Sequence, residues 1–488
     1  MRSATRLPQL TARAVLALAP FADDVRRSAT RQRCYLVGGS VRDAFLGRPC
    51  TDFDFALGGP QRVAAAVSRR LGGVLVQLHE THRIYRVALR RGGVRFYLDF
   101  AALAPAGLAA DLRARDFTIN TLAAGPLAGR ARLYDPCGAR TDLARGLVRM
   151  TAREALVRDP VRIVRAYRFA ATLGFRLEAR TRRACAALAG LLSQCAAERL
   201  GSELLLALGA EAYETPLQAM ADDSVLAALI PEFAPTVGVE QGGVHEFDVA
   251  AHSLLATARL AEIMRRPDAF FPEHGGRVAQ YLADDRTRSG LVLATLLHDI
   301  GKPERRTWGG RRWRFFGHEQ RGAELARQAV SRLRLPRPVR RQVADLVGSH
   351  MRILPFMQTD EPTLRARRRF MRDAAPHGTG AVLLALADRR ALRARPGFED
   401  DEATARRLAS LLAADEEGAA ARTHDVPVNG DDLRRLGLVP GPQFRTILGA
   451  VEEQWIAGQL GDREDALAWV RSRFVGPSAD LEERGKRQ

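Results

Sequence analysis

Residues 35–55 read YLVGGSVRDAFLGRPCTDFDF, and their pattern indicates the fold of the first part of the chain. The short apolar run at its start predicts a strand, which the glycine pair Gly38-Gly39 ends before a helical stretch. At its end, phenylalanines alternate with Asp52 and Asp54, as is typical of a strand with one apolar and one acidic face. The stretch therefore predicts a strand–turn–helix–strand unit with carboxylates on one face.

Outward from this unit, the pattern divides the chain into a small head of strands and helices and a long helical body. Strands and helices mix up to about residue 147, and beyond it apolar residues recur with the 3.6-residue period of a helix. The sequence therefore predicts an α+β fold with a mostly α-helical second part. The further strands of the head are expected at 74–78, 83–90 and 94–100, after a helix at 60–71.

The composition points to a polyanionic partner. The 488 residues include 75 basic and 56 acidic side chains, which give a net charge of +19. Such an excess favours nucleic acid or an anionic membrane surface as the partner. No apolar run reaches the length of a membrane helix, so we expect a soluble, cytoplasmic protein. Five scattered cysteines without a CxxC pair argue against a disulfide framework or a thiolate zinc site.

The acidic doublet and the glycine turn together predict a phosphate-transfer site. Asp52 and Asp54 are two residues apart on a strand, so both carboxylates leave from the same face and favour Mg²⁺. Gly38-Gly39 lets a phosphate approach the backbone amides and the start of the helix, where Arg42 adds a charge-assisted contact. This set suits a metal-bound nucleoside triphosphate attacked in line by a hydroxyl. Either motif alone is better explained as a solvated strand or an ordinary turn.

GGSVRD followed by TDFDF resembles the signature of the class II tRNA CCA-adding nucleotidyltransferases and bacterial poly(A) polymerases. The resemblance covers nearly the whole chain. It implies a polymerase-beta-like nucleotidyltransferase head and a template-independent, magnesium-dependent addition of C and A from CTP and ATP to the tRNA 3′ end. Further motifs in the family's order are RDFTIN (115–120), YDPCG (134–138), RDPVRIVRAYRFAATLGF (158–175), ERL (198–200) and NGDDLRRLGLVPGPQFRTIL (429–448).

The resemblance also implies roles for individual residues. Asp52 and Asp54 match the magnesium ligands, and Asp99 is a candidate third carboxylate that would activate the 3′ hydroxyl. With the glycine turn, the expected nucleotide-binding residues are Gly38, Gly39, Arg42, Arg115, Asp159, Arg162, Arg165 and Arg168.

An Asp/Arg edge would explain how protein side chains select C and A. Asp159, Arg162 and Arg165 recur every three residues and so lie roughly along one helix face. A carboxylate only accepts hydrogen bonds and a guanidinium only donates them, which suits cytosine and adenine and leaves buried groups unpaired against uracil and guanine. Asp159 followed by Pro160 is also typical of a helix N-cap, and one residue could serve both purposes.

Two departures from the family pattern leave the product open. Arg158 stands where the family usually has an acidic residue, and the segment between Asp99 and Arg115 is short. Several family members have a longer basic loop there, which helps to switch from C to A addition. CCA addition is the expected activity, with CC-only, A-only and poly(A) addition as alternatives. Two alternatives belong to other functional classes. One is a phosphohydrolase whose head only binds nucleotide, and the other is a basic RNA-binding protein without catalysis.

A second set of histidines and aspartates lies in the helical body. LLHDIGKP (296–303) resembles the signature of the HD metal-dependent phosphohydrolase superfamily, and GHEQRG (317–322) and ALADRR (385–390) resemble its later ligand segments. Such nitrogen and oxygen ligands suit a divalent transition metal or Mg²⁺ and the hydrolysis of a phosphate ester. The expected ligands are His252, His298, Asp299, His318, His350 and Asp388.

These assignments predict four domains. Arginine clusters at 305–314, 334–341 and 365–372 are candidate contacts for tRNA phosphates, with solvated helix faces as the alternative. Aromatic residues are only 6% of the chain, so base stacking is not the evident mode of RNA binding. The expected domains are a nucleotidyltransferase head at 1–147, a nucleotide-selecting, RNA-binding neck at 148–240, an HD domain at 241–395 and a tRNA-binding tail at 396–488.

Overall fold

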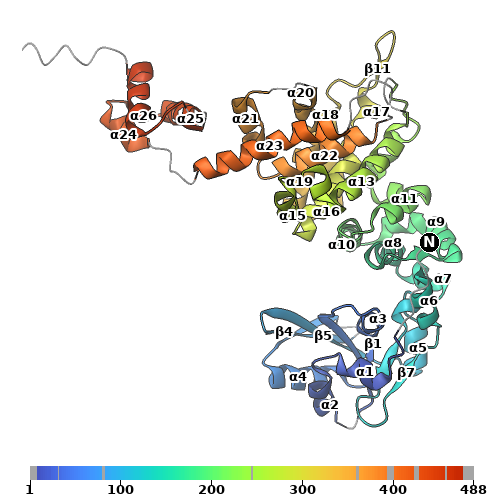
Figure 1. Cartoon of the computed structure of the whole chain (residues 1–488). Helices are drawn as coiled ribbons and strands as arrows, with labels where there is room; N and C mark the ends of the chain where they lie inside the picture. Colours follow the sequence, from blue (N-terminus) through green and yellow to red (C-terminus); the bar gives the residue numbers. More distant parts are fainter. Residues whose placement is uncertain are drawn as a thin grey trace, which may run out of the picture. The chain divides into compact units, whose positions relative to one another are not determined.

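The computed structural model divides into two compact units (Figure 1). The first comprises residues 1–234 with 328–337, and the second comprises residues 235–327 with 338–488. The residues that the structure describes are 8–30, 32–79, 83–242, 246–358, 362–392, 401–422, 428–456 and 459–475.

The first unit is built on a seven-stranded mixed sheet. β2 (Asp52–Leu57) pairs in parallel with β5 (Val94–Ala102), and every other pair of neighbours is antiparallel. This sheet confirms the α+β prediction and places the acidic strand β2 at its centre. The strand order is β3 (Val74–His79), β4 (Ile84–Arg91), β5, β2, β1 (Cys34–Val37), β6 (Ala123–Gly125) and β7 (Arg132–Tyr134).

The two faces of β2 differ as the alternating pattern predicts. Phe53 and Phe55 are buried, and the ring of Phe55 stacks on Phe100 of β5 with centroids 5.4 Å apart. Asp52 is exposed and Asp54 is half-buried. Because burial of the phenylalanines fixes the strand, both carboxylates point away from the core on the same face.

The helices of the head occupy the positions that the sequence predicts. α3 (Gly39–Phe45) begins directly after the glycine turn, and α4 (Pro60–Leu71) has its proline at the first helical position. β6 and β7 were not predicted, because three-residue strands are too short to show an alternating pattern. Four short helices, α1 (Ala12–Ala17), α2 (Ala22–Ser28), α5 (Leu108–Arg113) and α6 (Ala139–Arg145), complete the head.

Helices form most of the rest of the first unit, which also contains a small parallel pair of strands, β8 (Leu147–Val148) and β9 (Arg176–Leu177). The helical period is interrupted after α11 (Glu214–Asp222), because Ser224 has a φ of 58° before α12 (Val225–Leu229) begins. The carboxylate of Asp223 accepts hydrogen bonds from Tyr167 (2.7 Å) and Arg182 (2.8 Å), which holds the break. The helices are α7 (Arg153–Arg158), α8 (Val161–Leu173), α9 (Ala179–Leu188), α10 (Ala197–Leu208), α11 (Glu214–Asp222) and α12 (Val225–Leu229).

In the second unit, α13 (Val249–Arg265) and α16 (Asp285–Leu297) pack against α22 (Gly378–Arg390). The apolar residues of α16 and α22 are almost all buried, so these helices form the interior of the unit. No helix in the described part of the chain has the length and apolar character needed to cross a bilayer. The neighbouring helices are α17 (Lys302–Arg305), α18 (His318–Arg332), α19 (Arg337–Ser349), α20 (Leu354–Gln358), α21 (Leu364–Asp373) and α23 (Asp401–Arg422).

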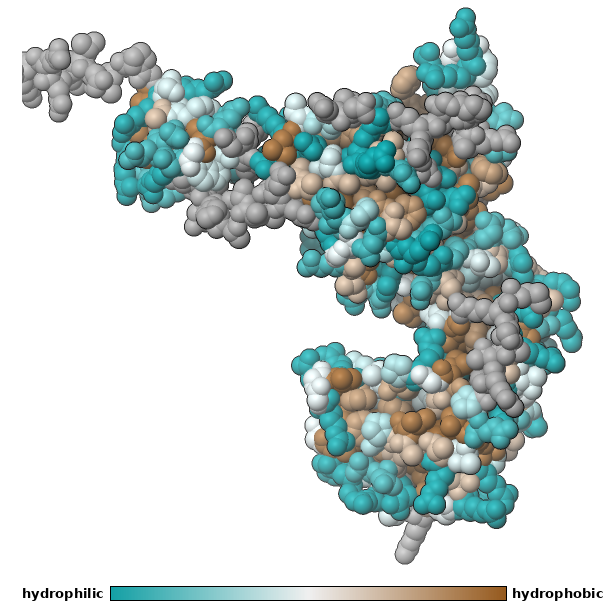
Figure 2. All heavy atoms as spheres, in the orientation of Figure 1, coloured by the Kyte–Doolittle hydropathy of each residue, from teal (hydrophilic) through white to brown (hydrophobic). Residues whose placement is uncertain are grey.

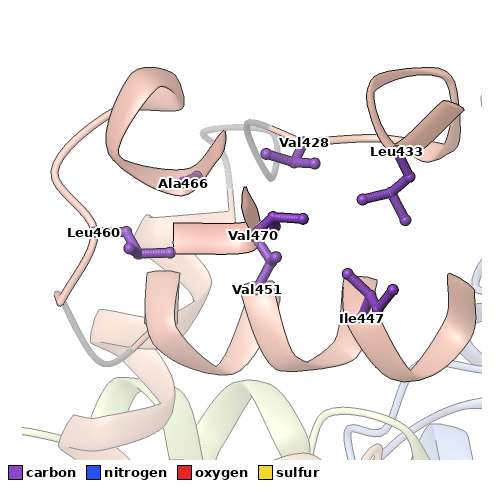
Figure 3. Packing of buried hydrophobic residues seen from close by; sticks show 7 residues of the cluster. All are labelled: Val428, Leu433, Ile447, Val451, Leu460, Ala466 and Val470. Carbon is purple, nitrogen blue, oxygen red and sulfur yellow. The ribbon is translucent and has the colours of Figure 1, made fainter. Parts of the chain in front are cut away.

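The last helices, α24 (Gly430–Arg435), α25 (Pro442–Ile456) and α26 (Arg463–Val470), enclose an apolar core of their own (Figure 3). Asn429 starts α24 with a reciprocal capping box, in which its side chain and that of Asp432 each bond the other's backbone amide. The buried core residues are Val428, Leu433, Ile447, Val451, Leu460, Ala466 and Val470.

Candidate functional site

Three carboxylates meet on one face of the sheet in the head. The parallel register of β2 and β5 places Asp99 directly beside Asp54, and Asp52 lies on the same face two residues earlier. Burial and the neighbouring negative charges raise the pKa of Asp54 to about 6, and burial raises the pKa of Asp52. Because a divalent cation would relieve this repulsion, and because carboxylate oxygens are hard ligands, the three residues fit a magnesium site.

Asp99 has a cationic partner that the sequence did not indicate. Arg86 of β4 donates two hydrogen bonds to Asp99, from Nε and Nη2 to the two carboxylate oxygens, each 2.7 Å long. The Arg86 guanidinium also lies over the ring of Tyr97, 4.8 Å from its centroid. Asp99 is therefore held in a fixed orientation beside Asp54.

The glycine turn brings a cation against the acidic strand. Val37 pairs with Asp54, so Gly38 lies next to that carboxylate with a φ of 74°. A Cβ at Gly38 would lie 2.6 Å from Nη1 of Arg115 and 3.3 Å from Oδ2 of Asp54. Glycine is required here both by the left-handed backbone and by the close approach of Arg115.

A pocket of about 390 Å³ opens beside these groups. Most of the nucleotide-binding residues expected from the sequence line it, whereas Gly38, Asp52, Asp99 and Asp159 do not. Asp116, Asn120 and Phe169 also line it and were not singled out, although they lie within the motifs RDFTIN and RDPVRIVRAYRF. The expected residues in the lining are Gly39, Arg42, Asp54, Arg115, Arg162, Arg165 and Arg168.

One wall of the pocket is organised by Arg42. Its Nη1 donates to the side-chain oxygen of Asn120 at 2.7 Å, and its Nε and Nη2 donate to Asp43. The guanidinium groups of Arg42 and Arg168 lie over the ring of Phe169, at 5.1 and 4.0 Å from its centroid. This ring fixes two cations, which explains why an aromatic residue lines a polar pocket.

The pocket arginines of α8 depend on two buried carboxylates. Glu203 of α10 accepts hydrogen bonds from Nε of Arg165 (2.8 Å) and Nε of Arg168 (2.6 Å). Burial disfavours the charge of Asp116, but Arg165 and the Asn120 amide lower its pKa below the usual value. Glu203 therefore holds both arginines through Nε, and Asp116 accepts a further hydrogen bond from Nη1 of Arg165 at 3.4 Å.

Asp159 lies at the end of α7 and does not cap α8. The helix α8 has Pro160 at its N-cap position and no side-chain capping bond, so the capping alternative is wrong. The Asp159 carboxylate accepts a hydrogen bond from Arg199 (2.8 Å) and lies 3.6 Å from Nε of Arg162. Asp159 is therefore next to the pocket-lining Arg162 without lining the pocket itself.

The histidines and aspartates of the second unit converge as the sequence predicts. Asp299 is central, with one carboxylate oxygen 3.2 Å from Nε2 of His298 and the other 3.2 Å from Nε2 of His318. Two ligand groups share it, one with His252 and His298 and one with His318 and His350. Asp388 completes the first group, since its carboxylate lies 2.8 Å from Nε2 of His252. All six predicted residues are thus brought together.

Backbone carbonyls orient three of these rings. The Nδ1 atoms of His298, His318 and His350 lie 2.7–2.8 Å from the carbonyl oxygens of Thr295, Phe315 and Val347, so Nδ1 carries the proton. Two unprotonated Nε2 atoms, of His318 and His350, then face each other at 3.2 Å, and the buried Nε2 of His298 lies 3.2 Å from the carboxylate of Asp299. Such converging lone pairs fit a divalent metal.

Lys302 was not assigned a role from the sequence. It follows the His-Asp pair by one helical turn, and its buried Nζ lies 2.6 Å from Asp299 and 2.6 Å from the amide oxygen of Gln241. Burial disfavours the charge of Asp299, but His298 and Lys302 hold its pKa well below the usual value. The shared carboxylate is therefore available as an anionic ligand.

Each of the two sites lies in a region that matches a known protein family. Residues 34–149 match the family described as poly A polymerase head domain, and residues 249–392 match the HD domain family. Residues 174–236 match the family described as probable RNA and SrmB-binding site of polymerase A.

Relatives match over most of the chain. One from Deinococcus radiodurans, named A-adding tRNA nucleotidyltransferase, is 36% identical over 89% of this chain and 94% of that protein. One from Thermus thermophilus, named CC-adding tRNA nucleotidyltransferase, is 34% identical over 90% of this chain and 94% of that protein. A multifunctional CCA protein of Pseudomonas fluorescens is 33% identical over 65% of this chain and 74% of that protein.

The fold is also that of solved CCA-adding enzymes. The Thermotoga maritima CCA-adding enzyme complexed with tRNA has a TM-score of 0.57 at 22% identity, with 94% of each chain covered. A complex of a CCA-adding enzyme with CTP has a TM-score of 0.58, again at 22% identity and with 94% of each chain covered. From its sequence relatives, its matched domains and this shared fold, the chain belongs to the family of tRNA nucleotidyltransferases and poly(A) polymerases and carries an HD domain.

Proposed function

We propose that the protein adds C and A residues to the 3′ end of tRNA from CTP and ATP. The observation that carries this proposal is the position of the three carboxylates of the head. Asp52, Asp54 and Asp99 stand beside a pocket whose lining includes five arginines, which suits a triphosphate on one side and an attacking hydroxyl on the other.

In this proposal each group of the head has a defined task. Asp52 and Asp54 hold magnesium, which when bound neutralises triphosphate charge and makes the 3′ hydroxyl more acidic. Arg42 and Arg115 bind phosphate oxygens by charge-assisted hydrogen bonds. The oxygen of the 3′ hydroxyl bonds to the α-phosphorus and gives its proton to Asp99. At the same time the bond between the α-phosphorus and the pyrophosphate oxygen breaks. In this arrangement no nucleobase of a template strand takes part in the reaction.

Base selection is assigned to the edge formed by Asp159 and Arg162. Arg162 lines the pocket and donates, while Asp159 beside it accepts, which matches the amino group and ring nitrogen shared by cytosine and adenine. Arg199 holds the Asp159 carboxylate in place through its 2.8 Å hydrogen bond. Arg158, exposed next to Asp159, takes no part in this edge.

A partial activity is the second candidate. The segment between β5 and Arg115 is short and half of it is α5. Two relatives that match most of the chain are named for A addition and for CC addition. Incubation with tRNAs that lack A, CA or the whole CCA, with each nucleotide singly and together, separates the cases. CCA completion from all three tRNAs supports the proposal. Arrest after CC, or extension of only the CC-ended tRNA, supports a partial activity, and long A tails contradict both.

For the second unit we propose metal-dependent hydrolysis of a phosphate ester. Six converging ligands with Asp299 shared between two groups support binding of a divalent metal, which when bound activates water toward phosphorus. Release of inorganic phosphate from small phosphomonoesters, in the presence of Mn²⁺, Ni²⁺ or Mg²⁺ in turn, tests this activity and identifies the metal. Absence of release and of tight metal binding would contradict it.

A further inference from the structure

An aromatic hairpin projects from the second unit close to the histidine–aspartate cluster. β10 (Thr307–Trp308) and β11 (Trp313–Arg314) pair so that Trp308 lies opposite Trp313, with ring centroids 5.0 Å apart. The hairpin extends beyond the helices around it (Figure 1). Trp308 is 59% exposed, and Phe316 directly after the hairpin is 76% exposed. Two large rings thus face solvent on one small element.

The same element is strongly cationic. Arg306 lies over the ring of Trp313, 3.7 Å from its centroid, and Arg314 lies 6.0 Å from that of Phe316. Arg306 comes within 3.8 Å of Glu240, but Arg311, Arg312 and Arg314 form no ion pair with any residue that the structure describes. In the space-filling view the projecting tip is mostly hydrophilic (Figure 2). Exposed rings among unpaired arginines suit a ligand that is both aromatic and anionic.

The base of the hairpin is joined to the metal-ligand cluster. The carbonyl oxygen of Phe315 accepts the hydrogen bond from Nδ1 of His318, at 2.8 Å. The ring of Phe315 lies beneath Nζ of Lys302, 5.5 Å from its centroid, and Lys302 in turn contacts Asp299. A ligand on the hairpin therefore lies next to the groups that would act on its phosphate.

We infer that this hairpin binds single-stranded RNA, with bases stacked on Trp308 and Phe316 and phosphates bound by Arg311, Arg312 and Arg314. Stacking favours a single strand over a duplex, because the bases of a duplex have no free faces. The inference gives the substrate class of the second unit as a phosphate carried on an RNA strand, and in that respect it rests on the proposed phosphohydrolase function. Binding itself does not depend on that function.

Photo-crosslinking separates this surface from the RNA-binding surfaces expected elsewhere in the chain. The full-length, metal-loaded protein is irradiated with a short RNA that contains 4-thiouridine, as a single strand or in a duplex, and the crosslinked peptides are identified by mass spectrometry. We expect crosslinks in 306–316 with the single strand and about tenfold fewer with the duplex. Crosslinks confined to other regions, or equal yields from both RNAs, would overturn the inference.

Variants make the test specific to the rings and the charges. Trp308→Ala with Phe316→Ala should lower the yield at the hairpin about tenfold, and Trp308→Phe with Phe316→Tyr should restore it. Arg311→Ala with Arg312→Ala should weaken the salt dependence, whereas Arg69→Ala with Arg70→Ala, an exposed pair on α4, should not change the hairpin yield. An unchanged yield in the alanine ring variant would overturn the inference.

A parallel assay distinguishes this inference from the proposed hydrolase. Phosphate release is measured from a 3′-phosphorylated oligonucleotide and from a small phosphomonoester. Hairpin crosslinks without release from either substrate would contradict the hydrolase and support the RNA-binding hairpin. The alanine ring variant could instead release as much phosphate as the wild type from both substrates. That result would contradict RNA binding by the hairpin and support the hydrolase.

Discussion

Arg86 holds the carboxylate of Asp99 through two parallel hydrogen bonds, and Asp99 in turn lies in register with Asp54 on the neighbouring strand. Bidentate pairing of this kind fixes both the position and the orientation of a carboxylate. The third acid of the head is thus set beside the two proposed metal ligands, Asp52 and Asp54, before any substrate binds. Its charge is partly compensated, which limits its repulsion of Asp54.

The first prediction concerns Asp99 as the acceptor of the hydroxyl proton. Asp99→Asn keeps the shape and one acceptor oxygen but removes the charge, so kcat for nucleotide addition should fall about 10²-fold or more. The KM for CTP should change less than about threefold, because Asp99 does not line the nucleotide pocket. Steady-state kinetics measure both constants. A kcat within a few-fold of the wild type would contradict the proposed role.

The second prediction concerns the glycine turn. Gly38→Ala should raise the KM for CTP about tenfold or more, because the new Cβ displaces Arg115 from its place beside Asp54. Gly47→Ala is the matched control, since Gly47 also has a positive φ but has no atom within 4 Å of the new Cβ. The control should lose about 1 kcal/mol of stability and retain its KM. Equal effects of the two variants on KM would contradict this reading.

The third prediction concerns Glu203, which holds two pocket arginines from behind. Glu203→Ala removes the shared partner of Arg165 and Arg168, so nucleotide affinity should fall and the free energy of unfolding should drop by about 2 kcal/mol. Glu198→Ala, on the same helix, removes only an exposed partner of Arg334 and should leave both quantities unchanged. Chemical denaturation and CTP titration measure them. Unaltered CTP affinity in Glu203→Ala would show that the arginines do not need this support.

The fourth prediction separates the two sites. His298→Ala or Asp299→Ala should abolish tight metal binding in the second unit and the proposed phosphate release, while tRNA addition stays within about twofold. His377→Ala is the control, because His377 lies in the same unit and contacts Tyr281 rather than the cluster. Metal analysis of the purified proteins gives the first readout. Full metal content in Asp299→Ala would contradict the shared-ligand arrangement.

Local spacing explains why much of the head site could be predicted. The doublet of β2 and the glycine turn are adjacent elements of one strand–turn–helix–strand unit, so their meeting follows from short-range geometry. Arg86 and Glu203 could not be found in this way. Arg86 meets Asp99 through cross-strand register, and Glu203 reaches α8 from a separate helix. Such contacts depend on tertiary packing rather than on periodicity.

The capping of α8 shows the opposite error. Asp159 before Pro160 has the sequence of an N-cap, but Arg199 binds the carboxylate and Pro160 takes the N-cap position. A long-range ion pair here overrides a local preference. The histidine–aspartate cluster was predicted because three segments resemble the ligand motifs of the HD superfamily. Lys302 was missed because its role appears only in its contact with Asp299.

The central claim is that Asp52 and Asp54 hold magnesium against the triphosphate. The most direct measurement is a crystal structure of the protein with CTP and Mg²⁺, with Mn²⁺ substituted to locate the ion by anomalous scattering. We expect an ion bound by oxygens of Asp52 and Asp54 at about 2.0–2.2 Å that also contacts the phosphates. CTP bound in the pocket with both carboxylates free of any ion and turned to solvent would contradict it.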